Sequence, residues 1–194
     1  MDFYSAGQQP PASPRPAHAD PGFSALELIV VLAVLASLAT FALPGFSLLL
    51  ERWRVRQTAQ SLQWSLLHAR TEALKRGSMF IERLPHNAHG CRQAAAQRDW
   101  SCGWVVFADA NGDRRWNAGE ETQRTDTPPG VSVVRSSGGA VIRLDQWGMM
   151  DGLNAQGFRI AAPDAAGPAR TVQAVCVASG GRIRTTDLGK SSCR

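Results

Sequence analysis

The sequence predicts an α+β protein in which one long N-terminal helix packs on a head made of an antiparallel β-sheet. Three observations lead to this fold class. No charged side chain lies between Glu27 and Glu51, so this run is long and apolar enough to cross a membrane as a helix. Residues 51–76 then repeat apolar side chains at steps of three and four. From Ser78 onward, short strand-like runs alternate with turn signals.

The first 22 residues differ in composition from everything that follows. They are polar and rich in proline, with no helical or strand periodicity, so they are treated as a leader outside the fold. The 194 residues leave room for one membrane anchor and one domain. We therefore divide the chain into a leader at 1–22, a transmembrane segment at 23–50, an amphipathic helix at 51–77 and a β-rich head at 78–194.

The helix is predicted in two halves. Pro44-Gly45 lies between them and is expected to interrupt the helix, because proline removes a backbone donor and kinks or locally melts the turn. The second half is predicted to end at Gly77, a typical C-cap residue. One face of this half is apolar and is expected to pack on the sheet. It consists of Val55, Ala59, Leu62, Leu66, Ala69 and Ala73.

Short apolar runs separated by glycine, proline and asparagine predict the strands of the head. Turn signals include Asn111-Gly112, Pro128-Pro129-Gly130 and Ser179-Gly180-Gly181. The predicted strands are Met79–Leu84, Gly103–Ala108, Val131–Val134, Val141–Leu144, Gly157–Ala161, Val172–Ala178 and Arg182–Thr185.

Four cysteines follow the apolar run: Cys91, Cys102, Cys176 and Cys193. An even number beyond a membrane anchor is typical of disulfides in an oxidising compartment. Three pairings are possible for four cysteines. We favour Cys91–Cys102 and Cys176–Cys193, because each pair closes a short local loop.

The formal net charge is +5, and nearly all the basic residues are arginines. Arginine binds phosphate through two parallel hydrogen bonds and stacks on planar groups. An arginine-rich head therefore favours a polyanionic partner, although surface charge also serves solubility.

The N-terminal pattern of Gly22, Phe23, Glu27 and Pro44 resembles that of type IV prepilins and type II secretion pseudopilins. The resemblance implies that a prepilin peptidase cuts after Gly22 and that the new N-terminal Phe23 is N-methylated. It places Glu27 at the fifth mature position and Pro44 about midway along the apolar helix. It also implies an inner-membrane protein with a single span and a periplasmic C-terminal head, incorporated into a pilus or pseudopilus beside other major and minor subunits.

Physical chemistry offers a role for Glu27. A carboxylate in a lipid-embedded helix is costly and needs a partner, and the α-amine of Phe23 in a neighbouring subunit would supply one and set the assembly register. The alternative is an ordinary anchor with its acidic residue near the positive end of the helix dipole. Three arginines directly after the apolar run would by the positive-inside rule keep that end in the cytoplasm. They are Arg52, Arg54 and Arg56. The cysteines and the prepilin pattern favour export instead.

A second pattern lies in the head. Residues 100–109, Trp-Ser-Cys-Gly-Trp-Val-Val-Phe-Ala-Asp, lead into Asn111-Gly112-Asp113 and the acidic turn Gly119-Glu120-Glu121. This arrangement resembles the H-type (GspH) minor pseudopilins and the FimT-like minor pilins. With it, the resemblance covers most of the chain.

Two segments of the head contain side chains that could bind a metal ion. The loop from Asp109 to Glu120 has oxygen-bearing side chains at calcium-loop spacing, but Arg114 stands where a glycine is wanted. The alternative is a hairpin loop whose Asp and Asn side chains cap turns. A zinc set could be drawn from His86, His89, Cys91 and Cys102, but its spacing is irregular and a disulfide uses the cysteines better. We predict neither a metal nor a cofactor.

The last motif lies near the C-terminal end of the sequence and reads Gly180-Gly181-Arg182-Ile183-Arg184. It resembles a Gly-Arg-x-Arg motif of FimT-like pilins, which implies DNA binding in natural transformation. In a strand, Arg182 and Arg184 would share one face about 7 Å apart, near the spacing of successive phosphates. Lys190 and Arg194 would lie beside them. The alternative is a charged edge strand that blocks pairing. Trp100, Trp116 and Trp147 are expected to pack in the core or in turns rather than to stack on bases.

Two functions follow from these patterns. The first is a FimT-like minor pilin that helps pilus biogenesis and binds DNA through its C-terminal arginines. The second is an H-type minor pseudopilin of the type II secretion system, with a structural role and no contact with DNA. No nucleophile elbow, phosphate-binding loop or dinucleotide fingerprint is present, so we interpret the chain as a non-enzyme.

Overall fold

The computed structural model describes residues 24–85, 91, 96–151, 155–162, 171–178, 180–187 and 193, leaving aside the side chains of residues 41–45. The chain divides into two compact units, Met1–Leu43 and Pro44–Arg194. One helix, α1 (Ala25–Arg76), contributes residues to both units. The strands of the described chain all belong to the second unit.

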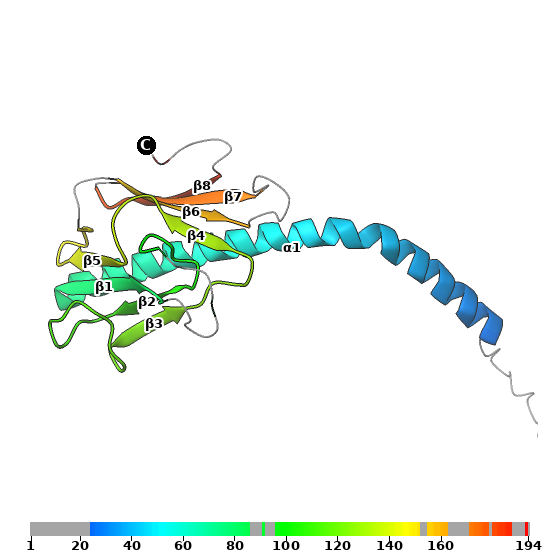
Figure 1. The fold of residues 1–194 in the computed structure, drawn as a ribbon, viewed down its shortest axis with the longest axis horizontal. Coiled ribbons are helices and arrows are strands. Elements are labelled where there is room, and N and C mark those ends of the chain that lie inside the picture. Colours follow the sequence, from blue (N-terminus) through cyan, green and yellow to red (C-terminus); the bar gives the residue numbers. More distant parts are fainter. Residues whose placement is uncertain are drawn as a thin grey trace, which may run out of the picture. The chain divides into compact units, whose positions relative to one another are not determined.

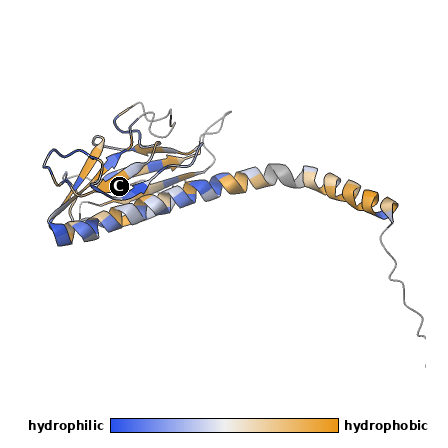
Figure 2. Cartoon of the chain, turned by 90° about the horizontal axis from the view of Figure 1, so that it is seen from below, coloured by the Kyte–Doolittle hydropathy of each residue, from blue (hydrophilic) through white to orange (hydrophobic). Residues whose placement is uncertain are grey.

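The described part of the first unit is the N-terminal part of α1. The hydroxyl oxygen of Ser24 accepts a hydrogen bond of 3.2 Å from the backbone N–H of Glu27, which satisfies one of the free donors at the start of the helix. The side chains that follow are mostly apolar and exposed, as the orange colouring of this segment shows (Figure 2); Leu26 is 75% exposed and Ile29 is 66% exposed. Over the described residues, no helix is long and apolar enough to cross a membrane.

The part of α1 in the second unit buries one face completely. All six residues of the predicted apolar face have no exposed surface, so that prediction is confirmed. The helix also ends where expected. Gly77 has a φ of 93°, and its N–H donates to the carbonyl of Ala73 at 2.8 Å, as a left-handed C-cap requires.

Pro44 does not divide the helix. The structure assigns a single α-helix from Ala25 to Arg76, so the prediction that Pro44-Gly45 interrupts it is wrong. The physical reason is that proline removes only one backbone donor, and the residues on either side keep their own hydrogen bonds. The boundary between the two compact units still falls directly before Pro44.

The head contains two antiparallel sheets of four strands each (Figure 1). The first has the order β3-β2-β1-β5 and the second the order β4-β6-β7-β8. The strands are β1 (Ser78–Arg83), β2 (Trp104–Phe107), β3 (Glu121–Thr125), β4 (Ser132–Arg135), β5 (Val141–Asp145), β6 (Gln156–Ala161), β7 (Val172–Val177) and β8 (Ile183–Asp187). The chain crosses from the second sheet to the first between β4 and β5, and returns between β5 and β6.

The main core lies between α1 and both sheets. The buried face of α1 contacts side chains of the first sheet such as Ile81 and Val106, and side chains of the second sheet such as Phe158 and Val175. Within this core, a buried hydrogen bond of 2.9 Å from the indole Nε1 of Trp104 to the Ser65 hydroxyl oxygen links α1 to the first sheet. Burial of this one helix face therefore holds the two sheets together.

A smaller core covers the outer face of the first sheet. It consists of Phe80, Leu84, Cys102, Val105 and Phe107, with Cys91, Trp116 and Val141 packed against them. The rings of Phe80 and Phe107 stack with centroids 5.5 Å apart. Strand β2 consequently has both faces buried, which explains why its sequence is apolar without interruption.

Arg135 holds the crossover between β4 and β5. Its guanidinium is buried, donates to Gln156 Oε1, and donates to the carbonyls of Gly139 at 2.9 Å and Val141 at 3.1 Å. The same group lies 5.8 Å from the centre of the Trp100 ring. Burial lowers the pKa of Arg135 to about 10, which leaves it charged at neutral pH.

Sequence patterns located seven of the strands to within about two residues and missed β3. Strand β3 reads Glu-Thr-Gln-Arg-Thr and is exposed or half-buried along its length. It is paired only with β2, at the edge of the first sheet. An edge strand without an apolar face gives no periodic signal, so the Gly119-Glu120-Glu121 turn was predicted there and its continuation as a strand was not.

Candidate nucleic-acid interface

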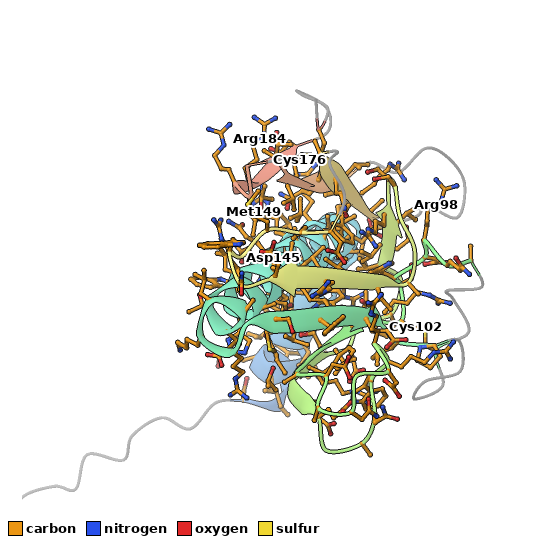
Figure 3. All side chains as sticks on the ribbon, turned by 90° about the vertical axis from the view of Figure 1, so that its left-hand side faces the viewer. Arg98, Cys102, Asp145, Met149, Cys176 and Arg184 are labelled. Atoms are coloured by element: carbon orange, nitrogen blue, oxygen red, sulfur yellow. A yellow bond between two sulfur atoms is a disulfide. The ribbon has the colours of Figure 1, made fainter. Side chains whose placement is uncertain are left out.

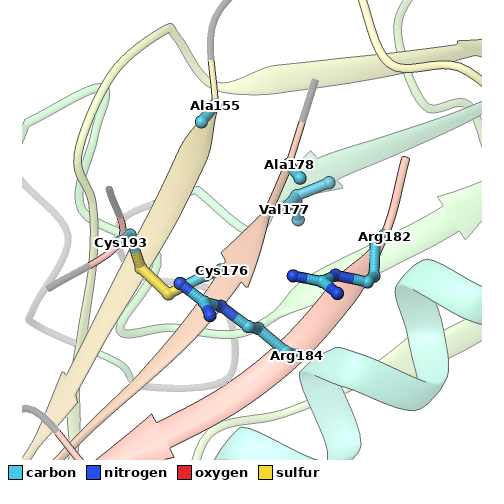
Figure 4. Close-up of a pocket in the computed structure, with 7 residues that line it drawn as sticks. All are labelled: Ala155, Cys176, Val177, Ala178, Arg182, Arg184 and Cys193. Carbon is cyan, nitrogen blue, oxygen red and sulfur yellow. A yellow bond between two sulfur atoms is a disulfide. The ribbon is translucent and has the colours of Figure 1, made fainter. Parts of the chain in front are cut away.

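The two arginines of the Gly-Arg-x-Arg motif lie at the edge of the second sheet. Arg184 is in β8, and Arg182 directly precedes that strand; both are exposed. Ile183 between them is half-buried and packs against the main core. Figure 4 shows the two guanidinium groups extending in the same direction from β8. The strand alternation predicted for this segment is therefore present.

The disulfide Cys176–Cys193 lies beside Arg184. Cys176 of β7 is the direct partner of Arg184 in the antiparallel ladder, so the two side chains share one face of the sheet. The structure joins Cys176 to Cys193 (Figure 4), in the pairing favoured by short loop closure. A Cβ on Gly157 of β6 would lie 2.8 Å from Cys193 Sγ, so glycine makes room for the cross-link.

Both arginines also border a shallow hollow of about 270 Å³. Small and apolar groups form the rest of its lining, which comprises Ala155, Cys176, Val177, Ala178 and Cys193. Arg182 and Arg184 are thus the charged residues of a lining that is otherwise uncharged. Arg184 projects outward at one edge of the head, well apart from Cys102 (Figure 3).

Two side chains of α1 contact this edge of the sheet. Arg70 Nη1 donates to the carbonyl of Gly181 at 2.7 Å. The Thr185 hydroxyl donates to Gln63 Oε1 at 2.7 Å. Sequence patterns did not reveal these residues, because each contact joins positions more than a hundred residues apart.

The other predicted site residues are only partly described. Gly22, Phe23, Lys190 and Arg194 lie outside the described residues, as does the side chain of Pro44. Glu27 is described and lies exposed in the first turn of α1. The structure thus brings together Arg182, Arg184 and the cross-link Cys176–Cys193, while the proposed assembly residues stay predictions.

The loop from Asp109 to Glu120 directs its oxygen atoms at its own backbone. Asp109 accepts hydrogen bonds from the amides of Gly112 and Arg114, and Asp113 accepts one from the amide of Arg115. The side chain of Asn117 donates to Asp113 and lowers the pKa of that carboxyl below its ordinary value. Among the described residues, no group of three or more His, Cys, Asp or Glu side chains could hold a metal ion.

The second disulfide joins Cys91 to Cys102, again as short loop closure favoured. His86 and His89 of the considered zinc set lie outside the described residues. The tryptophans pack in different ways. Trp100 is completely buried, and Trp116 packs on the smaller core, whereas Trp147 lies in a turn and is 70% exposed.

The fold and part of the sequence of this chain match those of known proteins. An N-terminal helix packed into an antiparallel β head is the fold of the type IV pilin-like proteins, and the minor pilin FimU of Pseudomonas aeruginosa shares it. In two crystal forms FimU superposes with TM-scores of 0.53 and 0.55 at 19% identity, covering 72% and 74% of this chain and 99% and 98% of FimU. The chain belongs to the GspH family, described as type II transport protein GspH, whose sequence profile matches residues 58–181.

A curated relative extends the comparison. The pilin-like protein PilA1 of Thermus thermophilus is 32% identical over 100 residues. The match covers 52% of this chain and 55% of the relative, so the chain spans about half the length of that protein.

Proposed function

We propose that the chain is a FimT-like minor subunit of a type IV filament, which takes part in pilus biogenesis and binds DNA for uptake. Membership of the GspH family supports the filament role. The exposed pair Arg182 and Arg184, on one face of an edge strand, is the observation that carries the DNA-binding part. The proposal gives the chain a structural and binding role, without catalysis or a cofactor.

The mode of binding follows from the geometry. The two guanidiniums project in the same direction from alternate residues of the chain (Figure 4), and alternate residues of a strand are about 7 Å apart along the backbone. Guanidinium–phosphate contacts fix a nucleic acid in place without reading its sequence. The expected ligand is therefore DNA of any sequence, bound in a manner that depends strongly on salt.

Assembly is proposed to use the N-terminal unit. The prepilin peptidase would cut after Gly22, and Phe23 would become the methylated N-terminus. Residues 23–50 would anchor the chain in the inner membrane with the head in the periplasm, until Glu27 pairs with a neighbouring subunit. The exposed apolar surface of α1 before residue 41 supports this proposal, because such a surface needs lipid or other helices around it.

A second function is favoured by the family description itself, which refers to type II transport. An H-type pseudopilin would use the same leader, helix and head, and its arginines would serve only as a charged edge that prevents strand pairing. The two functions differ in one measurable property, the affinity of the head for DNA.

The test is DNA binding by the full chain in nonionic detergent at two salt concentrations. We expect binding without sequence preference that weakens as salt rises. The double variant Arg182→Ala/Arg184→Ala should bind much more weakly, and its salt slope should be smaller by about 1.5, since each lost phosphate contact removes about 0.7–0.9 from the slope.

The matched control is Arg52→Ala/Arg56→Ala, which removes the same charge from exposed positions on α1. It should retain wild-type binding. If the wild type binds no better than the Arg182/Arg184 variant, the DNA-binding function is wrong and the structural pseudopilin remains. Equal losses in both double variants would show that net charge, not this strand, attracts DNA.

A further inference from the structure

The guanidinium of Arg70 binds the turn that links β7 to β8. Arg70 Nη1 donates to the carbonyl of Gly181 at 2.7 Å. Gly181 is buried and has a φ of 76°, in the left-handed region that favours glycine. Its N–H donates to the carbonyl of Ala178 at 2.8 Å, which closes the turn. The carbonyl that Arg70 binds thus belongs to the residue directly before Arg182.

Two glycines leave space for the Arg70 side chain. A Cβ on Gly181 would lie 3.2 Å from Arg70 Nη1, which is tighter than ordinary van der Waals contact. A Cβ on Gly148, in the turn after β5, would lie 2.7 Å from Arg70 Cγ. The aliphatic stem therefore packs on one glycine and the guanidinium on another. A side chain at either position would displace Arg70 or the turn.

A second contact joins α1 to the middle of β8. Thr185 donates to Gln63, which lies two helical turns before Arg70 on the same side of α1. Thr185 follows Gly181 by four residues, and four residues of strand span a distance comparable to those two helical turns. Polar contacts with α1 therefore lie on both sides of the residue pair Arg182 and Arg184.

We propose that Arg70 is the positioning residue of the Arg182–Arg184 site, and that it holds the turn so that both guanidiniums face a phosphate backbone. The inference rests on the proposed DNA-binding function. Arg182 depends on this contact most, because it precedes the first residue of β8; within the part of the chain that the structure describes, its carbonyl accepts one backbone bond of 2.9 Å, from the N–H of Ala178. A site that is ordered before binding loses less conformational entropy when its ligand arrives.

The anchor itself is tested without DNA. Hydrogen exchange of the Gly181 and Ala178 amides is measured in the full chain in nonionic detergent. Arg70→Met keeps the apolar stem but removes the donor, and it should speed exchange of both amides by about tenfold or more. Arg70→Lys keeps a donor and a charge and should recover most of the protection. Arg56→Met, an exposed charge loss on the same helix, should change nothing. Wild-type protection in Arg70→Met would overturn the proposal.

The positioning role is then tested with a DNA oligonucleotide of mixed sequence. Arg70→Met should weaken binding about tenfold, and Arg70→Lys should restore it. In the Arg182→Ala/Arg184→Ala background, Arg70→Met should cause no further loss, because a positioning residue acts through the residues that it positions. An equal further loss would mean that Arg70 binds DNA directly, which contradicts the proposal. If the wild type binds no DNA, the proposed function fails, and the exchange experiment alone decides whether Arg70 holds the turn.

Discussion

At the scale of single residues, Gly103 shows how strictly one position can be constrained. A Cβ at this residue would lie 2.2 Å from the backbone oxygen of Thr125 on the neighbouring strand. The φ of Gly103 is 105°, which other residues rarely adopt. The glycine of the Cys-Gly-Trp sequence is therefore required both by the backbone and by the close approach of β3.

We expect Gly103→Ala to lower the free energy of unfolding by more than about 2 kcal/mol, because it adds a backbone clash to an unfavourable φ. Gly77→Ala provides the matched control. Gly77 has a similar φ of 93°, but a Cβ there would meet nothing within 4 Å. Its cost should be about 1 kcal/mol. Chemical denaturation of both variants measures these free energies of unfolding. Equal losses of stability in the two variants would show that movement of β3 relieves the clash.

At the scale of elements, the loop from Asp109 to Glu121 is held by carboxylates that bind its own donors. The indole of Trp116 donates to Glu121 at 3.0 Å and lowers the pKa of that carboxyl. The pKa of Asp113 is also lowered, chiefly by the side chain of Asn117. A carboxyl with a lowered pKa stabilises the folded state above its ordinary pKa. That stabilisation is lost as the pH falls through the lower, folded value.

The loop should therefore keep its structure above about pH 5 and loosen below about pH 4, where the ordinary pKa values of Asp and Glu lie. The indole N–H resonance of Trp116, followed by NMR during an acid titration, reports the change. Asn117→Ala removes the largest cause of the Asp113 shift and should move the transition to higher pH. An indole signal that stays constant down to about pH 2 would contradict this account.

The sequence predicted some of these contacts well and others not at all. The buried face of α1 was predicted residue by residue, because helical periodicity acts over short distances. The contact between Arg70 and Gly181 spans 111 positions, and no local pattern encodes it. Of the two glycines that accommodate Arg70, Gly181 was predicted only as part of a turn, and Gly148 was not singled out. The arginine pair of the site was therefore predictable, and the residues that support it were not.

At the scale of the whole molecule, the outer face of α1 in the second unit carries two large exposed aromatic side chains. Trp53 is 60% exposed and Trp64 is 68% exposed. They are separated by about three helical turns, so they lie on the same side of the helix. In the proposed filament this surface is available to a neighbouring subunit.

The double variant Trp53→Ala/Trp64→Ala should leave the thermal midpoint of the head almost unchanged, because exposed side chains contribute about 0.5 kcal/mol or less to folding. Recovery of the chain with other filament subunits should fall sharply, since aromatic side chains dominate interface energetics. Leu74→Ala, another exposed apolar residue of α1, is the control. Unchanged co-purification would exclude this face from assembly.

The class of fold was accessible from the sequence, but the division of the strands into two sheets was not. Pairing of β1 with β5 and of β4 with β6 depends on contacts between distant segments, which strand patterns do not specify. One long helix was predicted and is confirmed, but its local interruption at Pro44 was wrong, because the local rule for proline was given more weight than the helical residues around it.

The alternation of the chain between the sheets has a consequence for how the head folds. Strand β5 completes the first sheet only after β4 has been synthesised for the second, and β4 finds its partner β6 only after β5. The strands of the two sheets are thus interleaved along the chain, and α1 closes both sheets against one core. The head should lose its structure in a single cooperative transition, without a half-folded species that exposes one sheet edge to aggregation.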